Sequence, residues 1–337
     1  MALAGKTSVG IGKNLRVGVI GAGVMGSNHA RVFGGLSDVT LVGIADPLDA
    51  HRSRATDLIG CRTFATFEDL LREGVDAVTI AAPTHLHHEI ALACIAQKVH
   101  VMVEKPIAST VEEGHEIVAA ARRANVTLMV GHVERFNPAV ETVKQAIKGE
   151  EILSIAITRV GPFPPRMSNV GVVIDLAVHD IDLIRWFTES EIVEVQPQLS
   201  SAVAEREDIA LLQFRTASGV LAHINTNWLT PFKARNVTVA TRGKYVMGDL
   251  LTRQVTECFG FQPDGSYSMR HLSVGYEEPL RSELAAFVGA VRSGASPAVT
   301  GDEGVASLEI AIQCLESSSS KRDKPNLQVE PRRAAIA

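Results

Sequence analysis

Short apolar runs alternate with amphipathic ones through residues 15–132. The apolar runs are rich in Val, Ile and Leu and predict strands at 15–20, 39–45, 75–82, 99–104 and 126–131, with a weaker one near 61–65. A helical period predicts helices between them, such as Ser27–Phe33, Phe67–Arg72, His88–Gln97 and Val111–Ala124. Near-continuous apolar strands that alternate with helices are typical of a doubly wound parallel sheet with helices on both faces.

The pattern changes after about residue 150. A strand at 152–160 and a strong helix at Val172–Thr188 precede alternating segments at 192–199, 208–215, 219–227, 236–241, 244–250 and 254–259. Turn pairs such as Ser218-Gly219 suit tight connections between antiparallel strands, and Arg281–Arg292 and Asp302–Ser318 are predicted closing helices. We therefore expect a flexible tail at 1–14, a doubly wound α/β domain at 15–132, a second α/β domain at 133–320 and an extended or disordered tail at 321–337.

Composition narrows the class of protein. Of the 337 residues 46% are hydrophobic, which is enough for two cores. The net charge is −5 and no run is dense in Lys or Arg, so neither nucleic acid nor a membrane is an expected partner. No apolar run is long enough for a membrane span, and the four widely separated cysteines favour reduced thiols and a cytoplasmic location. A positive mean hydropathy favours a homo-oligomer, a dimer or a tetramer.

The run Gly21-Ala-Gly-Val-Met-Gly26 lies between a predicted strand and a predicted helix. In a dinucleotide site Gly21 permits the tight turn, Gly23 lets the backbone approach the pyrophosphate, and Gly26 lets the helix pack on the strand. Asp46 ends the next strand, 20 residues after Gly26, where a carboxylate binds a ribose hydroxyl and repels a 2′-phosphate. The pattern predicts an NAD site, although two arginines shortly after Asp46 keep NADP as an alternative.

Lys105 directly follows the strand at 99–104. The carboxyl ends of parallel strands border the crevice where open α/β sheets bind ligands, so Lys105 is placed beside a bound nicotinamide. The sequence leaves the isomer of the Lys105–Pro106 bond open. Asp175 and His179 are spaced i,i+4 on the predicted helix at Val172–Thr188, which puts them on one face. We expect His179 to accept a proton and Asp175 to orient it or bind substrate; a buried structural pair is the alternative.

Three histidines and a glutamate follow the strand at 75–82: His85, His87, His88 and Glu89. They invite a metal interpretation, but no further Cys or carboxylate lies at ligand spacing, and such residues also begin helices. We expect no metal. Because this loop meets the nicotinamide ribose in dinucleotide folds, we assign it to the cofactor site instead.

Several motifs together resemble the Gfo/Idh/MocA oxidoreductase family. They are the glycine run, Pro83 with His87 four residues later, Glu104-Lys105-Pro106, Gly131-His-Val-Glu-Arg-Phe-Asn-Pro138 and Asp175-Leu-Ala-Val-His-Asp-Ile-Asp182. The resemblance extends from about residue 15 to 320. It implies an N-terminal Rossmann domain and a C-terminal α/β domain whose open, mostly antiparallel sheet forms the floor of the substrate pocket and a subunit interface. It also implies hydride transfer between NAD and a ring carbon of a sugar or similar polyol.

The resemblance also implies roles for individual residues. Lys105 would contact the reacting hydroxyl and the nicotinamide ribose, His179 would be the general base or acid, and Asp175 would help to bind substrate. Further cofactor contacts are expected from Val24, Met25, Ala82, Pro83, Thr84, His85, His88, Glu104 and Arg135, and further substrate contacts from Arg135, Arg166 and Arg235.

Two segments resemble the nucleotide-sugar branch of the family: Gly131–Pro138 and Asn227-Trp-Leu-Thr-Pro-Phe-Lys-Ala-Arg235. Cations for a diphosphate are available in this part of the chain at Arg159, Arg166, Lys233 and Arg235. The expected reaction is oxidation of C3 of UDP-N-acetylglucosamine by NAD, which gives a 3-keto nucleotide sugar. One alternative is a dehydrogenase of the same family for inositol, a simple sugar or a UDP-sugar acid. The other is a non-catalytic NAD-sensing regulator.

Overall fold

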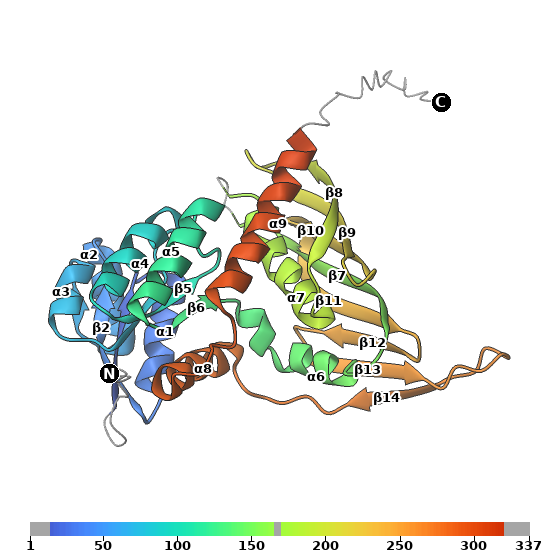
Figure 1. Cartoon of the computed structure of the whole chain (residues 1–337), viewed down its shortest axis with the longest axis horizontal. Helices are drawn as coiled ribbons and strands as arrows, with labels where there is room; N and C mark the ends of the chain where they lie inside the picture. Colours follow the sequence, from blue (N-terminus) through green and yellow to red (C-terminus); the bar gives the residue numbers. More distant parts are fainter. Residues whose placement is uncertain (1–13, 165–169, 320–337) are drawn as a thin grey trace, which may run out of the picture.

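Two sheets dominate the structure (Figure 1). The computed structural model describes residues 14–164 and 170–319, so the expected tails lie outside the described residues except for residue 14. The first sheet contains β1 (Leu15–Ile20), β2 (Val39–Ala45), β3 (Thr63–Phe64), β4 (Ala77–Ile80), β5 (His100–Glu104) and β6 (Leu128–Gly131). Its order is β3-β2-β1-β4-β5-β6, and every pair is parallel. The order reverses between β1 and β4, and doubly wound sheets bind ligands at this switch point.

Helices connect the parallel strands. They are α1 (Val24–Gly34), α2 (Asp49–Ile59), α3 (Phe67–Arg72), α4 (His87–Ala96) and α5 (Val111–Ala124). Thr66 and Thr110 are the N-cap residues of α3 and α5, and each hydroxyl accepts a hydrogen bond from the backbone N–H three residues later. The structure confirms every strand and helix expected here, with ends shifted by three residues or fewer.

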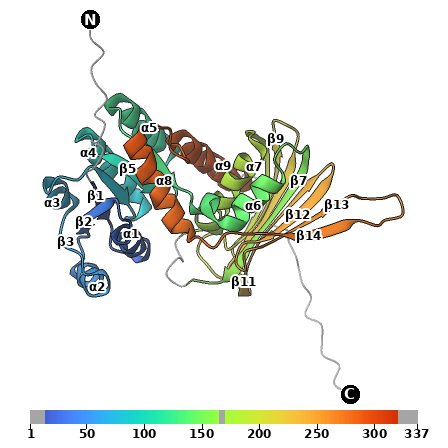
Figure 2. The ribbon, with the colours of Figure 1, turned by 90° about the horizontal axis from the view of Figure 1, so that it is seen from below.

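The second sheet has eight strands in the order β14-β13-β12-β11-β7-β10-β9-β8. They are β7 (Ile152–Pro162), β8 (Ile192–Ser200), β9 (Ile209–Thr216), β10 (Leu221–Asn227), β11 (Leu229–Thr241), β12 (Lys244–Asp249), β13 (Gln254–Phe259) and β14 (Ser268–Leu272). Only the β7–β10 pair is parallel among these strands, which confirms the mostly antiparallel sheet. Buried and exposed residues alternate along β9 and β10, so one face is packed and the other is open. The packed face carries α6 (Pro138–Ala146), α7 (Val178–Thr188) and α9 (Gly301–Ser319) (Figure 2).

The helix expected over Val172–Thr188 is interrupted. Val173–Ala177 form a π-helical turn, and α7 begins at Val178. A π turn closes its hydrogen bonds one residue further along the chain than an α turn, so residues spaced i,i+4 are not directly stacked. Asp175 lies in this turn and His179 in α7, and no hydrogen bond joins their side chains in the described part of the chain.

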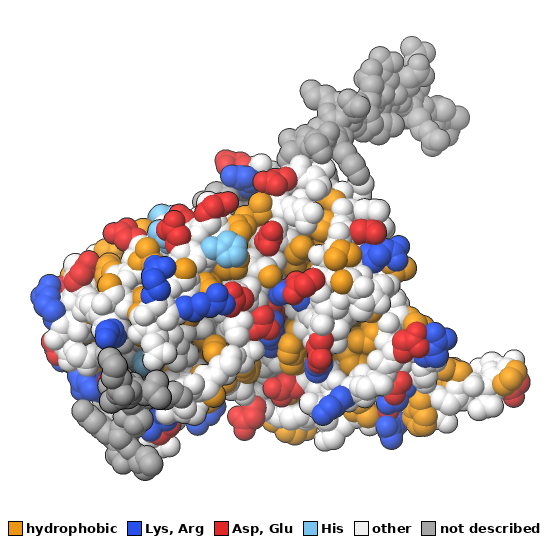
Figure 3. Space-filling model, in the orientation of Figure 1, with side chains coloured by type: hydrophobic (Ala, Val, Ile, Leu, Met, Phe, Trp, Pro, Cys, Tyr) orange, Lys and Arg blue, Asp and Glu red, His pale blue; other side chains and the backbone are white. Residues whose placement is uncertain are grey.

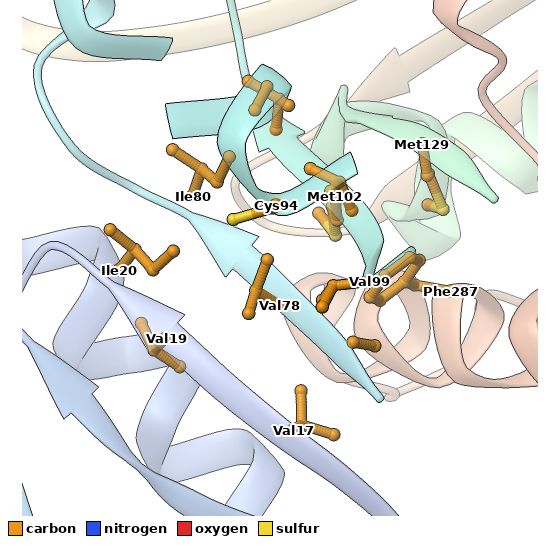
Figure 4. Close-up of a cluster of buried hydrophobic side chains, with 14 of the residues drawn as sticks. Val17, Val19, Ile20, Val78, Ile80, Cys94, Val99, Met102, Met129 and Phe287 are labelled. Carbon is orange, nitrogen blue, oxygen red and sulfur yellow. The ribbon is translucent and has the colours of Figure 1, made fainter. Parts of the chain in front are cut away.

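The last two helices join the two parts of the molecule. α8 (Pro279–Ser293) follows the second sheet in sequence but packs on the first, and Phe287 lies beside Val99 and Met102 (Figure 4). The first part of α9 also contributes Val305 to this core. A second core lies between the inner face of the eight-stranded sheet and helices α6 and α7. The domain division at residue 132 stays a prediction, because α8 crosses it in space.

The surface carries both signs of charge. Acidic and basic side chains are interspersed over the face shown in Figure 3. No helix in the described ranges is long and apolar enough to cross a membrane. All four cysteines are free.

Candidate active site

The turns that follow β1, β4 and β5 border a cavity of about 610 Å³. The first sheet supplies the glycine-rich turn, the segment after β4 and Lys105. The second part supplies residues of β7 and β11, the π turn and His179. A cavity of this size, lined from both sides, accommodates a small-molecule ligand.

The three motif glycines have different surroundings. Gly21 has φ +98°, and a Cβ there would lie 2.6 Å from the Ala81 carbonyl oxygen. A Cβ on Gly26 would clash with the Gly21 carbonyl oxygen, whereas a Cβ on Gly23 would meet nothing within 4 Å. Gly23 is also the N-cap of α1, and no side chain caps this end. The open backbone and the uncapped N–H groups therefore fit the pyrophosphate of NAD.

Asp46 is fixed beside this turn. It is 8% exposed, its Oδ2 accepts the Ala22 N–H at 2.8 Å, and the same oxygen lies 3.1 Å from His51 Nδ1. The guanidinium of Arg52 is bonded to oxygens of its own loop. A carboxylate at this place binds the ribose hydroxyls of NAD and disfavours a 2′-phosphate.

Lys105 and Asp175 meet across the cavity. The Lys105 Nζ donates to the Asp175 carbonyl oxygen at 2.6 Å and to its Oδ1 at 3.3 Å. The Lys105–Pro106 peptide bond is cis. His87 lies behind it, with Nδ1 2.9 Å from the Pro106 carbonyl oxygen and Nε2 2.9 Å from the Ala82 carbonyl oxygen. His87 therefore ties the turn after β5 to the turn after β4.

Glu104 anchors the other side of Lys105. Its Oε1 lies 3.0 Å from His29 Nε2 on α1, and its Oε2 accepts the Lys105 backbone N–H at 3.3 Å. Burial acts to raise the pKa of Glu104, but His29 and Lys105 outweigh it and the pKa is lowered. Glu104 lines the cavity as an ionised carboxylate that is already bound to the protein.

His179 lines the cavity as a neutral base. Burial above all, and then the charges of Lys105 and Arg159, hold the pKa of His179 well below 6.5. Its Nδ1 is buried and has no hydrogen-bond partner in the described residues. The ring of His132 is perpendicular to it, at 89°, with the centroids 6.0 Å apart. Asp175 does not orient His179, because the π turn directs it to Lys105 instead.

A network of buried charges forms the opposite wall. Arg159 is 2% exposed and donates to Asp180 and, at 2.7 Å, to Glu134. The same Glu134 oxygen accepts a hydrogen bond from Arg235 at 3.1 Å. Burial, and next the charge of Arg159, lower the pKa of Arg235. Lys233 lines the same cavity and forms no ion pair within residues 14–164 and 170–319. Positive charge therefore remains available to an anionic ligand.

Some predicted site residues lie elsewhere. Arg135 is 4% exposed, donates to both Asp182 oxygens and to Glu303, each at 2.7 Å, and does not line the cavity, so its expected contact with cofactor or substrate stays a prediction that this geometry does not support. Arg135 lies in the 3-10 turn Val133–Phe136, and this turn directs its side chain toward α7 and α9.

The structure also places two predicted histidines and one predicted arginine. His85 is exposed and His88 is bonded to Glu116 at 2.8 Å, and neither lines the cavity. Arg159 lines it but is neutralised by its carboxylate partners. Arg166 lies outside the described residues.

The segment Gly131–Pro138 contributes two residues that were not expected, His132 and Glu134. His132 follows β6 as Lys105 follows β5. Both therefore lie at the carboxyl end of a parallel strand, but only Lys105 lines the cavity, whereas His132 is buried behind its lining. Glu134 has no such signal, because its role depends on two arginines from the second sheet.

No group of three or more His, Cys, Asp or Glu side chains in the described ranges is arranged to hold a metal ion. The cavity offers a dinucleotide turn and a lysine on one side and a neutral histidine on the other, which is the arrangement of an NAD-dependent oxidoreductase. The chain belongs to the GFO/IDH/MocA oxidoreductase family. The model of the NAD-binding Rossmann fold of this family matches residues 15–132, and the model of its C-terminal domain matches residues 142–246.

The relatives include dehydrogenases for a nucleotide sugar and for inositol. UDP-N-acetylglucosamine 3-dehydrogenase of Acidithiobacillus ferrooxidans is 30% identical over 71% of this chain and 75% of its own length. A solved structure of that enzyme superposes with a TM-score of 0.85 at 26% identity, over 91% of this chain and 98% of the other. Inositol 2-dehydrogenase of Rubrobacter xylanophilus is also 30% identical, over 96% of both chains. Both relatives are named as dehydrogenases of a ring compound, which is UDP-N-acetylglucosamine in one case and inositol in the other.

Proposed function

We propose that the protein oxidises C3 of UDP-N-acetylglucosamine with NAD and forms a 3-keto nucleotide sugar. The observation that carries this proposal is the presence of two cationic side chains in the same cavity as Lys105 and His179. Lys233 forms no ion pair in the described residues, and Arg235 shares the Glu134 carboxylate with Arg159. A diphosphate pairs with such cations, whereas inositol carries no charge that would need them. An inositol dehydrogenase is the second candidate, because inositol 2-dehydrogenases match nearly the whole chain.

The proposed reaction assigns a task to each residue near the reacting carbon. The glycine-rich turn and Asp46 would hold NAD, which would supply the acceptor for the hydride that leaves the sugar C3. The hydroxyl proton moves to the Nε2 of His179, which is neutral because its pKa is lowered. The Lys105 ammonium donates a hydrogen bond to the hydroxyl oxygen as negative charge develops there. Asp175 holds Lys105 in place and binds a neighbouring hydroxyl.

We also propose that the protein is a homo-oligomer in the cytoplasm. A row of outward residues crosses five strands of the eight-stranded sheet: Arg215, Leu221, Ser154, Ala240 and Tyr245. Leu221 is 50% exposed and Tyr245 is 40% exposed. An uncovered sheet face that contains large apolar side chains supports self-association through this face.

The test is a substrate panel. The purified protein is incubated with NAD and, separately, UDP-N-acetylglucosamine, free N-acetylglucosamine, a UDP-sugar acid and inositol, and NADH formation is followed. We expect the highest kcat/KM with UDP-N-acetylglucosamine. Arg235→Gln and Lys233→Gln should each raise KM for this substrate about ten-fold, the loss expected for one charge-assisted hydrogen bond. Lys148→Gln, which is exposed and outside the cavity, is the matched control.

Three outcomes separate the candidates. Turnover of inositol with no turnover of any UDP-sugar contradicts the nucleotide-sugar proposal and supports the inositol enzyme. Equal kcat/KM for the free and the UDP-linked sugar removes the role of the two cations. Tight NAD binding without turnover of any substrate supports a regulator, or an enzyme that retains its NADH.

A further inference from the structure

The π turn that carries Asp175 begins with backbone N–H groups that need acceptors. The first N–H groups of a helix have no partner within the helix. The residue before the turn is Val172, whose apolar side chain cannot accept a hydrogen bond. The acceptors come instead from Glu207, which lies 34 residues after Val173, in the loop between β8 and β9.

Glu207 accepts hydrogen bonds from two consecutive N–H groups at this start. Its carbonyl oxygen accepts the Val172 N–H at 2.9 Å, and its Oε1 accepts the Val173 N–H at 3.2 Å. Both valines are 0% exposed, so a lost acceptor would leave a buried N–H group without a partner. A carboxylate at this end of a helix also faces the positive end of its dipole. Glu207 therefore caps the turn from a segment that is distant in sequence.

Gly171 leaves the space that the Glu207 carboxylate occupies. A Cβ at position 171 would overlap this carboxyl group. The backbone of Gly171 is not in the left-handed region, so space and not conformation requires a glycine here. The Gly171 carbonyl oxygen also accepts the Asp175 N–H at 3.0 Å, which joins the capped end of the turn to Asp175.

Asp208 holds the loop that presents Glu207. It is 0% exposed, and its own N–H donates to the Ser200 carbonyl oxygen at 3.0 Å. Its carboxylate accepts three backbone N–H groups of the same loop at 2.6 to 2.9 Å, those of Ala202, Val203 and Ala204. The loop therefore presents Glu207 from a backbone that is itself fixed by hydrogen bonds.

The turn holds Lys105 mainly through its backbone. The Lys105 Nζ is 2.6 Å from the carbonyl oxygen of Asp175 and 3.3 Å from its carboxylate. A backbone acceptor moves only when the turn moves, and the turn is closed by the Val173 carbonyl oxygen, which accepts the Val178 N–H. Val173 therefore joins Glu207, through its N–H, to the closed turn, through its carbonyl oxygen.

We propose that Glu207 is a positioning residue for Lys105: it fixes the π turn whose Asp175 carbonyl oxygen holds the Lys105 ammonium beside the reacting hydroxyl. The inference rests on the proposed function, in which Lys105 donates a hydrogen bond to that hydroxyl. Glu207 is not part of the cavity lining in the described residues, so it acts through the turn. A displacement of a catalytic group by about 1 Å can lower a rate by about 10²-fold.

Reductive methylation of the full chain, with NAD and without sugar, tests the effect on Lys105 directly. Mass spectrometry gives its labelling rate relative to that of Lys148, which is exposed. Glu207→Ala should raise this rate several-fold, because the Lys105 ammonium loses its fixed acceptor. Gly171→Ala should act in the same way, since its Cβ displaces the carboxylate. Glu207→Gln keeps an acceptor oxygen and should resemble the wild type, as should the control Glu205→Ala, an exposed neighbour in the same loop.

An unchanged Lys105 labelling rate in both Glu207→Ala and Gly171→Ala overturns the inference. If Glu207→Ala does not fold, Gly171→Ala carries the measurements that follow. Failure of every substrate in the panel overturns the proposed function, whereas the labelling result is obtained without any sugar. The two proposals therefore fail separately.

Kinetics with the substrate that the panel identifies test the consequence for catalysis. Glu207→Ala should lower kcat roughly ten-fold and leave KM for NAD nearly unchanged, whereas Glu207→Gln should keep the wild-type kcat. In the Lys105→Ala background, Glu207→Ala should change kcat by less than about two-fold, because residues that act through one another are not additive. A full loss in that background, or an unchanged kcat in Glu207→Ala alone, contradicts positioning through Lys105.

Discussion

Lys105 and His179 have complementary tasks at the residue scale: Lys105 donates hydrogen bonds, and His179 accepts a proton. Burial and neighbouring cations lower the pKa of His179, so its base form persists to acidic pH. Lys105 is held by Asp175 from the other part of the molecule. Each residue therefore owes its chemical state to groups that are distant in sequence.

Lys105→Ala and His179→Ala should each lower kcat by about 10²–10⁴-fold, the usual contribution of a positioned acid or base. NAD affinity should stay close to that of the wild type, because the glycine turn and Asp46 are untouched. The acidic limb of the wild-type kcat/KM profile should lie below pH 6.5, since a lowered pKa keeps His179 unprotonated above that pH. Steady-state kinetics and NAD titration check these expectations. Near-wild-type turnover in both variants would remove the catalytic assignment.

Glu283 on α8 is a buried acid that the reaction does not use. It is 0% exposed, neither oxygen has a hydrogen-bond partner in the described ranges, and burial followed by the charge of Glu104 raises its pKa well above 4.5. The folded protein therefore keeps a proton that the unfolded chain loses above pH 4.5. The free energy of unfolding therefore falls as pH rises from 4.5 to the raised pKa of Glu283 in the folded protein.

Glu283→Gln should remove this loss of stability, because an amide does not titrate. We expect the variant to unfold at a higher urea concentration than the wild type at pH 8. Its free energy of unfolding should be higher by an amount on the order of 1–3 kcal/mol. The difference should shrink as pH falls below 4.5, where the wild-type carboxyl becomes protonated in both states. Glu309→Gln on the exposed face of α9 is the control. A constant difference at every pH would mean that packing, not protonation, separates the two proteins.

At the scale of elements, Arg135 links three of them. It comes from the turn after β6 and bonds Asp182 of α7 and Glu303 of α9. Asp182 is buried, so the guanidinium compensates a charge that water does not reach.

Arg135→Ala should lower the free energy of unfolding by about 3–5 kcal/mol, because it leaves the Asp182 carboxylate buried without its partner. Arg122→Ala, which breaks an exposed pair with Asp302, should cost about 0–1 kcal/mol. Urea denaturation of both variants provides the comparison. If Arg135→Ala weakens NAD binding instead and leaves stability unchanged, the residue belongs to the cofactor site after all.

Helices and strands could be predicted from the sequence where their buried apolar residues repeat with the period of a helix or a strand. The parallel strands and α3 and α5 agree with expectation because their apolar residues follow one face. α2 buries only Ala55 and β14 is exposed along nearly all its length, so neither has an apolar pattern to read. α6 was missed although Asn137 caps it and Pro138 is its first residue, which is a local start signal.

At the scale of the whole molecule, the open face of the eight-stranded sheet predicts self-association. Light scattering should give a mass of at least twice 36.1 kDa. Leu211→Lys combined with Leu221→Lys should shift the protein toward the monomer, because both side chains are 50% exposed on that face and a buried lysine is costly. Leu58→Lys on α2 is the control. A wild-type monomer, or a dimer unaffected by the sheet variants, contradicts an interface at this face.

The sequence by itself determined the parallel sheet, the NAD turn with Asp46, and the positions of Lys105, Asp175 and His179. These follow from local physics: strand and helix periods, the conformational freedom of glycine, and the rule that strand ends border the site. Only the tertiary structure decided that Asp175 bonds Lys105, that Arg135 bonds Asp182, and that Glu134 is shared by Arg159 and Arg235. The reason is that a charged side chain must find its partner once it is buried, and the partner is chosen by packing between elements far apart in sequence.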